Sequence, residues 1–166
     1  MLSYKSCPAL LDIYTTGYMI KTPCDLFFYE ENNEIFVKVK PEYKDFCGER
    51  QPMEGFPAPI GCHEKHFHWY AQWAAELPEG YSAIHLHPVN RFDLPFITLS
   101  GEIDSDNFFP RGSLPFFLKD GWSGVIPAGT PIAQIIPIKR SKWASNRYKA
   151  MYEDQFKKIE EDRKST

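Results

Sequence analysis

The sequence predicts a mainly β protein, and three observations lead to this fold class. Aromatic residues make up 16% of the chain, and 14 prolines and 10 glycines are spread through it. Several short runs alternate apolar and polar residues. Aromatic and β-branched residues favour strands, whereas proline and glycine end them. The length of 166 residues fits one domain with a substantial core, and a hydrophobic fraction of 43% excludes wholesale disorder.

The first 40 residues contain three strand-like runs, at 17–21, 25–29 and 34–40. The last run alternates polar and apolar residues, and Glu31-Asn32-Asn33 before it has the composition of a hairpin turn. Residues 41–68 follow with four prolines and three glycines, which predict a long irregular insertion. Long loops of this kind in compact domains are usually functional.

The strand pattern returns between residues 69 and 140. Tyr81 to His87 alternates, which places His85 and His87 on one face. Further strands are expected at 96–99, 114–118 and 132–136. After this single β domain of residues 1–140, apolar residues recur every three or four positions from 141 to 164. This spacing predicts one amphipathic helix, in the segment 141–166, packed on the domain.

Charge and hydropathy exclude several function classes. The formal net charge of −3 makes broad electrostatic binding of nucleic acid unfavourable. A local basic cluster would contact phosphate or a nucleic acid, or would be a solvated helix face, which is the usual explanation; it consists of Lys139, Arg140, Lys142, Arg147 and Lys149. No apolar run reaches the ~18 residues of a membrane-spanning helix, and the first residues do not form a secretory signal. We therefore expect a cytoplasmic protein with no membrane partner and four reduced cysteines.

Two segments carry a resemblance to a known family. One is Ser100-Gly101-Glu102-Ile103-Asp104-Ser105-Asp106, and the other is the run 126–136, which contains Gly129-Thr130-Pro131-Ile132-Ala133-Gln134. They resemble the G-x-I-D-x-D and G-[DT]-x-I-A-Q-[LI]-[IV] motifs of the trimeric dUTPase and dCTP deaminase superfamily. The run 90–94 lies where that family has P-R-S-G-L. The chain is also similar to an uncharacterised family of phage and bacterial proteins that shares its H-P-x-N-R-x-D-L-P and G-T-P-I-A-Q-x-I-P runs.

The resemblance implies a distorted β-barrel of the β-clip type that assembles as a homo-oligomer, commonly a trimer. It implies that Asp104 is the catalytic residue, which orients or activates a water, and that Arg91 and Gln134 contact phosphates. A carboxylate can accept a proton from water, and a guanidinium binds phosphate oxygens in a fork geometry. Asp93, Asp106 and Phe108 complete the expected ligand-binding set, and Mg²⁺ would accompany a nucleotide hydrolase.

The chain also departs from the family's pattern. Phe92 replaces the phosphate-binding serine, Asp93 replaces the following glycine, and a charged segment stands where the family has a Gly-rich arm. Three functions follow. The protein hydrolyses a nucleotide phosphate bond, or it sequesters or senses a nucleotide, or it uses the β-clip as a scaffold in an assembly. In either of the first two cases, we expect Arg91, Asp104 and Gln134 to converge at one concave surface, with Phe108 or Trp122 as an apolar wall.

Each charged pair in this set also has a structural interpretation. Asp104 and Asp106 would share a face of a strand, or would belong to a turn, because Ser-Asp-Asn favours turns. Arg91 and Asp93 would form a ligand clamp, or an ordinary ion pair that fixes a loop.

Two groups of residues suggest metal ligands. His85 and His87 would be the H-x-H of a cupin-like metal-dependent enzyme, but no histidine follows residue 87. A zinc site would draw on the insertion residues Cys47, Cys62, His63, His66 and His68. Paired ligand spacing is missing at Cys47, which lies alone. We therefore expect the protein to need no structural metal.

Overall fold

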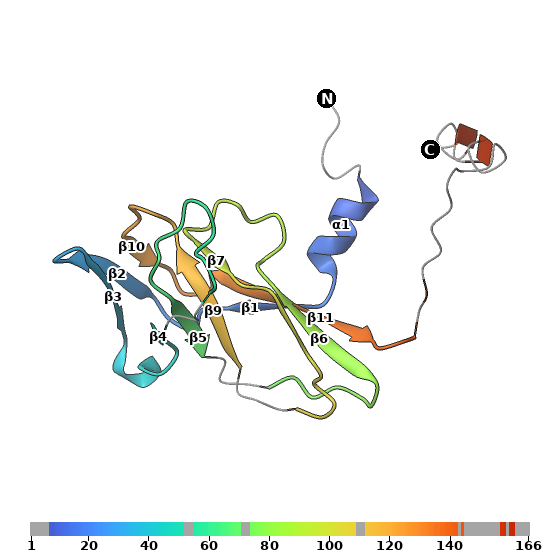
Figure 1. Cartoon of the computed structure of the whole chain (residues 1–166), viewed down its shortest axis with the longest axis horizontal. Helices are drawn as coiled ribbons and strands as arrows, with labels where there is room; N and C mark the ends of the chain where they lie inside the picture. The colour runs from blue at the N-terminus through green and yellow to red at the C-terminus, as the bar shows by residue number, and fades with distance from the viewer. Residues whose placement is uncertain are drawn as a thin grey trace.

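The computed structural model describes residues 7–51, 55–70, 74–108, 112–142, 144, 157–158 and 160–161. Over these ranges it confirms the mainly β class, with eleven strands in three antiparallel sheets (Figure 1). None of the helices in the described ranges combines the length and the apolar character needed to cross a bilayer.

The strands divide into three sheets whose neighbours are all antiparallel. The first sheet has the order β1 (Tyr18–Lys21), β11 (Pro131–Lys139), β6 (Tyr81–Leu86) and β8 (Gly101–Ile103). The second contains β10 (Gly124–Ile126), β2 (Leu26–Glu31) and β3 (Glu34–Val39). The third contains β4 (Cys47–Glu49), β5 (Phe67–Tyr70), β9 (Ser113–Leu118) and β7 (Phe96–Thr98). The described strands stay in these three sheets and do not close into one hydrogen-bonded barrel.

One core is shared by all three sheets, and its centre is aromatic. The Trp69 ring on β5 stacks on Phe116 of β9, with the ring centroids 3.7 Å apart. Trp69 Nε1 donates a hydrogen bond to Thr98 Oγ1 (3.1 Å), and this hydroxyl donates to the Ile132 carbonyl (2.7 Å). Because Ile132 belongs to β11, this chain of hydrogen bonds ties the third sheet to the first inside the core. Phe28 of β2 brings in the second sheet through its edge contact with Phe116.

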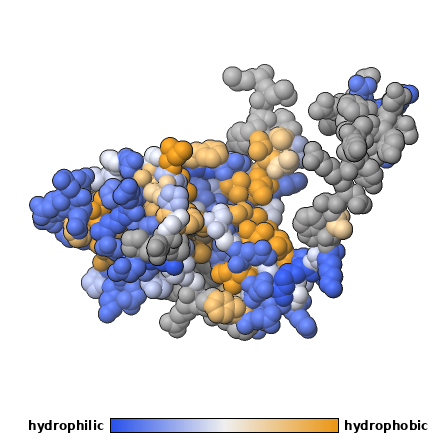
Figure 2. Space-filling model, in the orientation of Figure 1, coloured by the Kyte–Doolittle hydropathy of each residue, from blue (hydrophilic) through white to orange (hydrophobic). Residues whose placement is uncertain are grey.

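Helix α1 (Pro8–Thr15) stands away from the sheets and buries none of its side chains (Figure 1). Leu10, Leu11 and Tyr14 are exposed, and Figure 2 shows the resulting apolar surface along the helix. The helix reaches β1 through Gly17, which has a φ of +73°. A Cβ at this position would lie 2.0 Å from the Ile135 carbonyl oxygen, so only glycine fits between the helix and β11.

The predicted β elements are present, and the hairpin turn is confirmed. Asn32 and Asn33 have φ values of 53° and 64°, and they form a two-residue loop between the paired residues Glu31 and Glu34. Two positive φ values are what a type I′ hairpin requires. Helix α1 was not predicted, although Pro8 at its start and the apolar residues that follow are ordinary helix signals.

The segment 41–68 is less irregular than predicted. It contains the 3₁₀ helix η2 (Pro41–Tyr43), strand β4 and the start of β5. Phe46, Cys47 and Phe67 belong to the core, so this segment completes the domain instead of being inserted into it. The predicted C-terminal helix falls mainly outside the described residues. Its four described positions 157, 158, 160 and 161 are helical and exposed.

Candidate functional site

The loop between β6 and β7 holds two of the predicted ligand-binding residues in an ion pair. Arg91 Nε donates to Asp93 Oδ1 (2.8 Å), and Nη2 donates to Asp93 Oδ2 (2.7 Å). Both side chains are exposed to solvent. The hydrogen bond from Arg91 lowers the pKa of Asp93 to about 2. The pair therefore fixes the loop, and Arg91 reaches an anion only with its remaining N–H groups.

The half-buried side chain of His87 and the buried side chain of Gln134 hold the same loop in place. His87 Nδ1 accepts a hydrogen bond from Thr98 N–H (3.3 Å), so the ring proton is on Nε2 and is donated to the Arg91 carbonyl (3.2 Å). Gln134 Oε1 accepts from Val89 N–H (3.3 Å). The other end of its amide donates to the carbonyls of Ile13 (2.8 Å) and Thr16 (2.7 Å). Gln134 thus connects the loop with the end of α1, and its amide is not free to meet a phosphate.

The second group of predicted residues gathers around Arg140, and we call Asp104, Asp106 and Arg140 the arginine cluster. Arg140 makes a forked ion pair with Asp106, whose side chain is only 3% exposed, and the Gly80 N–H donates to the same carboxylate (2.7 Å). Asp104 Oδ1 accepts from the Ser82 hydroxyl (2.7 Å) and lies 3.1 Å from Arg140. Hydrogen bonds from Arg140 lower the pKa of Asp106 to about 2.

The expectation that Arg91, Asp104 and Gln134 converge is wrong within one chain. The register pairs Leu86 with Gln134 and Tyr81 with Lys139, so the two groups lie at opposite ends of β6. A six-residue strand spans about 17 Å. Asp104 and Asp106 do not share a face of a strand, because β8 ends at Ile103 and a turn follows, with Phe108 N–H donating to the Asp104 carbonyl (3.0 Å). Trp122 belongs to neither group, because its ring is tilted against Phe28 at the core.

Two predicted residues do meet at the surface. Asp104 and Phe108 line an open recess of about 510 Å³ together with Glu102 and Ile103, and we call it the Asp104 recess. The Phe108 side chain is 61% exposed, so its ring is free to cover a ligand. No lysine or arginine lines the recess among the described residues. This arrangement can accept hydrogen bonds from hydroxyl groups, whereas it offers no cation to a phosphate.

The last residue but one of β6, His85, belongs to a different kind of site, which we call the His85 pocket. His85 and Ser113 line a pocket of about 220 Å³ with Phe56, Leu99, Leu114 and Pro115. Among the described residues, the two ring nitrogens of His85 and the Ser113 hydroxyl have no hydrogen-bond partner. The alternation of β6 predicted only that His85 and His87 share a face, and no pattern in the sequence singled out Ser113. The bonding role of Arg140 was also missed, because it was interpreted as a solvated charge.

The candidate metal ligands are not brought together. The His87 ring is hydrogen-bonded to the carbonyl of Arg91 in the β6–β7 loop, and Cys47 is buried in the core. His66 packs on Phe117 with the ring centroids 4.3 Å apart, whereas His68 lies 4.1 Å from the Tyr70 ring. Within the described ranges, no three His, Cys, Asp or Glu side chains are arranged to hold a metal ion.

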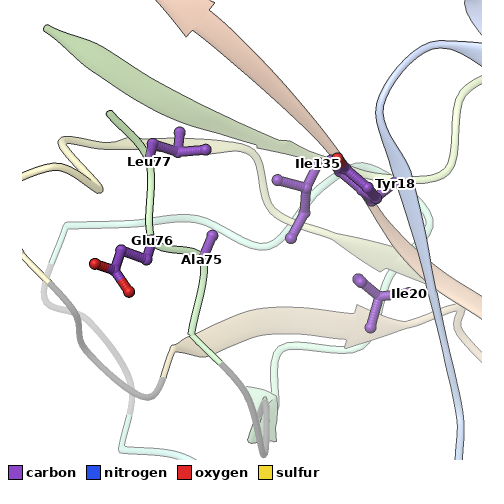
Figure 3. A pocket seen from close by; sticks show the side chains of 6 residues that line it. All are labelled: Tyr18, Ile20, Ala75, Glu76, Leu77 and Ile135. Atoms are coloured by element: carbon purple, nitrogen blue, oxygen red, sulfur yellow. The ribbon is translucent and has the colours of Figure 1, made fainter. Parts of the chain in front are cut away.

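A third recess, of about 290 Å³, lies beside β1 and is lined by Tyr18, Ile20, Ile135 and the segment 75–77 (Figure 3). Among the described residues of its lining, Glu76 alone is charged, and its carboxylate points away from Ile20 and Ile135 (Figure 3). The other polar side chain there is Tyr18, and the described lining holds no buried polar atom without a partner, so the recess is a weaker candidate than the other two.

No model of a known protein family matches the chain, and no curated protein sequence matches it either. The resemblance to the dUTPase superfamily therefore depends on the two sequence motifs.

Proposed function

We propose that the protein binds a nucleotide or nucleoside in the Asp104 recess and retains it without hydrolysing it. One observation carries this proposal: Asp104 and Phe108, each expected at a nucleotide site, line the same surface recess. Phe108 would cover the sugar, and Asp104 would accept a hydrogen bond from a sugar hydroxyl. The sequence motifs support a β-clip architecture as part of the same proposal.

The surroundings of Asp104 favour retention over hydrolysis. Its Oδ1 already accepts a hydrogen bond from the Ser82 hydroxyl and pairs with the Arg140 guanidinium. This oxygen therefore helps to hold the start of β6 to the residue after β11. The other oxygen, Oδ2, is left to accept the sugar hydroxyl, so no free oxygen remains to act as a general base on a positioned water.

Association of the chain would supply the missing cation. Arg140 lies beside Asp104 but is engaged by Asp104 and Asp106. Arg91 is displayed on an exposed loop at the far end of β6, so a second copy is the simplest source of a further guanidinium at the recess. We therefore include a homo-oligomer, expected to be a trimer, in the proposal. Light scattering should give about three times the mass of the chain, and a monomer at micromolar concentration would contradict this part.

A nucleotide panel tests the function. The protein is dialysed against deoxynucleosides and their mono- and triphosphates, with and without Mg²⁺, and free phosphate and pyrophosphate are measured. We expect stoichiometric retention without release of either. Phe108→Ala should weaken retention roughly tenfold, on the scale of a lost aromatic contact. Phe27→Ala, at an exposed aromatic on β2, is the matched control. Release of phosphate or pyrophosphate, or no retention of any member of the panel, would contradict the proposal.

A further inference from the structure

The His85 pocket is a second site, separate from the Asp104 recess. It lies between the first and third sheets, where β6 and β8 face the start of β9 and the residues after β7. It shares only Ile103 with the recess. Ser100 and Gly101 in its lining are exposed, so the pocket opens to solvent on the side of β8.

Its polar groups are unusual because they are buried and unpaired. His85 is 6% exposed, and both of its nitrogens lack a partner among the described residues. The Ser113 hydroxyl lines the same space and is also unpaired. Buried polar groups in native proteins are nearly always hydrogen-bonded, so groups left open in a pocket indicate a partner that comes from outside the chain.

The side chains that line the His85 pocket also indicate what charge its ligand can carry. No lysine, arginine, aspartate or glutamate lines the pocket in the described ranges. Burial lowers the pKa of His85, so the imidazole is neutral at pH 7. A charged ligand would lose its hydration without meeting an opposite charge, which is unfavourable. The pocket therefore suits an uncharged molecule.

The hydrogen-bonding groups of the pocket indicate which donors and acceptors the edge of the ligand must carry. A neutral imidazole offers one donor and one acceptor, and a serine hydroxyl offers both as well. Phe56, Leu99 and Leu114 provide an apolar surface around them. Drug-sized ligands occupy about 300–1,000 Å³, so a pocket of about 220 Å³ takes a smaller body of one or two fused rings.

We propose that the His85 pocket binds a small, uncharged nitrogen heterocycle whose ring edge carries both a hydrogen-bond donor and an acceptor. His85 and Ser113 pair with that edge, and the apolar lining covers the ring. This site does not depend on the function proposed for the Asp104 recess.

Benzimidazole at pH 8, where it is neutral, is a suitable probe, and the imidazole ¹⁵N signals of His85 provide the readout. We expect saturable shifts of both His85 nitrogens. Ser113→Ala should weaken binding roughly fivefold, and 1-methylbenzimidazole, which lacks the N–H donor, should bind weaker by a similar factor. His85→Phe, which keeps an aromatic ring of similar shape, should abolish binding. Because this variant has no His85 signals, its binding is followed by the broadening of the benzimidazole ¹H signals.

The controls separate this site from the nucleotide site. Phe108→Ala should leave benzimidazole binding unchanged, although it weakens nucleotide retention. If water alone fills the pocket, His85 will show no saturable shift. That result, or binding that neither Ser113→Ala nor His85→Phe reduces, overturns the proposal whatever the nucleotide panel shows.

Discussion

Polar side chains on and beside strand β6 have different surroundings, and comparing them separates paired from unpaired groups. Near the start of the strand, Ser82 donates to Asp104, which lies beside Arg140. Just past its end, His87 is held between Thr98 and Arg91. His85, the last residue but one of the strand, has no partner among the described residues. Ser82 and His87 therefore hold neighbouring segments in place, whereas the His85 imidazole bonds to no part of the described chain.

The largest effect is expected at the start of β6. Arg140→Met removes the partner of Asp106, whose side chain is 3% exposed, and leaves a buried carboxylate without its counter-charge. We expect the largest fall in the urea midpoint of any substitution discussed here. The double variant Arg140→Met with Asp106→Leu should recover part of the loss, because it also removes the unpaired charge. A midpoint equal to that of the wild type would show that the cluster does not stabilise the fold.

The next effect is expected at the end of β6. Gln134→Leu leaves two carbonyls at the end of α1 and the Val89 N–H without their partner. We expect a loss of about 2 kcal/mol in the free energy of unfolding, within the range for unpaired buried polar groups. Hydrogen exchange should rise at Val89. Gln134→Glu keeps the acceptor for Val89, so it should preserve that protection while it loses the donor to α1. Unchanged exchange in Gln134→Leu would contradict the bracing role.

Asp106 and Asp93 have similar pKa values, and acid titration of stability should distinguish how much each carboxylate stabilises the fold. Asp106 titrates at about 2 in the folded protein, below its ordinary value of 3.8. Its stabilisation is therefore complete above about pH 4 and is lost as the pH falls through 2. Asp106→Asn should flatten the fall in stability between pH 4 and pH 2. Asp93 is 64% exposed, so solvent and salt screen its ion pair, and Asp93→Asn should have a smaller effect. Equal flattening by both variants, measured by urea unfolding, would remove the distinction.

A gain in stability is expected at His85 of β6. His85→Phe replaces an imidazole with two unpaired nitrogens by an apolar ring. We expect the ligand-free protein to gain about 1 kcal/mol in the free energy of unfolding, since binding sites often cost stability. Ser82→Ala is a useful contrast, because its hydroxyl is paired and its removal should destabilise the protein. A loss of stability in His85→Phe would mean that the imidazole is satisfied in solution.

The smallest effect is expected on the β6–β7 loop. Arg91→Met removes only an exposed ion pair, so the melting temperature should stay within experimental error. Nucleotide retention by the assembled protein should nevertheless fall, because Arg91 is the proposed source of the cation at the Asp104 recess. A clear drop in melting temperature would assign Arg91 to the structure in the same way as Arg140.

The sequence was a better guide to strands than to the site, and particular residues show why. Alternation and the Asn32-Asn33 turn are local signals, so they located the hairpin and the long strands. Strands β4 and β8 have only three residues each, too few for alternation to be recognised. The role of Gln134 depends on carbonyls 121 and 118 residues away, and no local pattern reveals such a contact. The pairing of Ser113 with His85 in one pocket likewise arises only when two sheets pack together.

The bond from Gln134 to Ile13 also has a consequence for the order in which the chain is made. The residues that fix α1 and pair with β1 are synthesised more than a hundred positions after them, as the separation of 121 residues shows. The first strand and the apolar side chains of α1 therefore leave the ribosome long before β11 arrives. Contacts so distant along the chain form slowly, and exposed apolar segments are open to aggregation meanwhile. The emergence of β11 thus decides when the backbone of β1 gains its hydrogen-bonding partner.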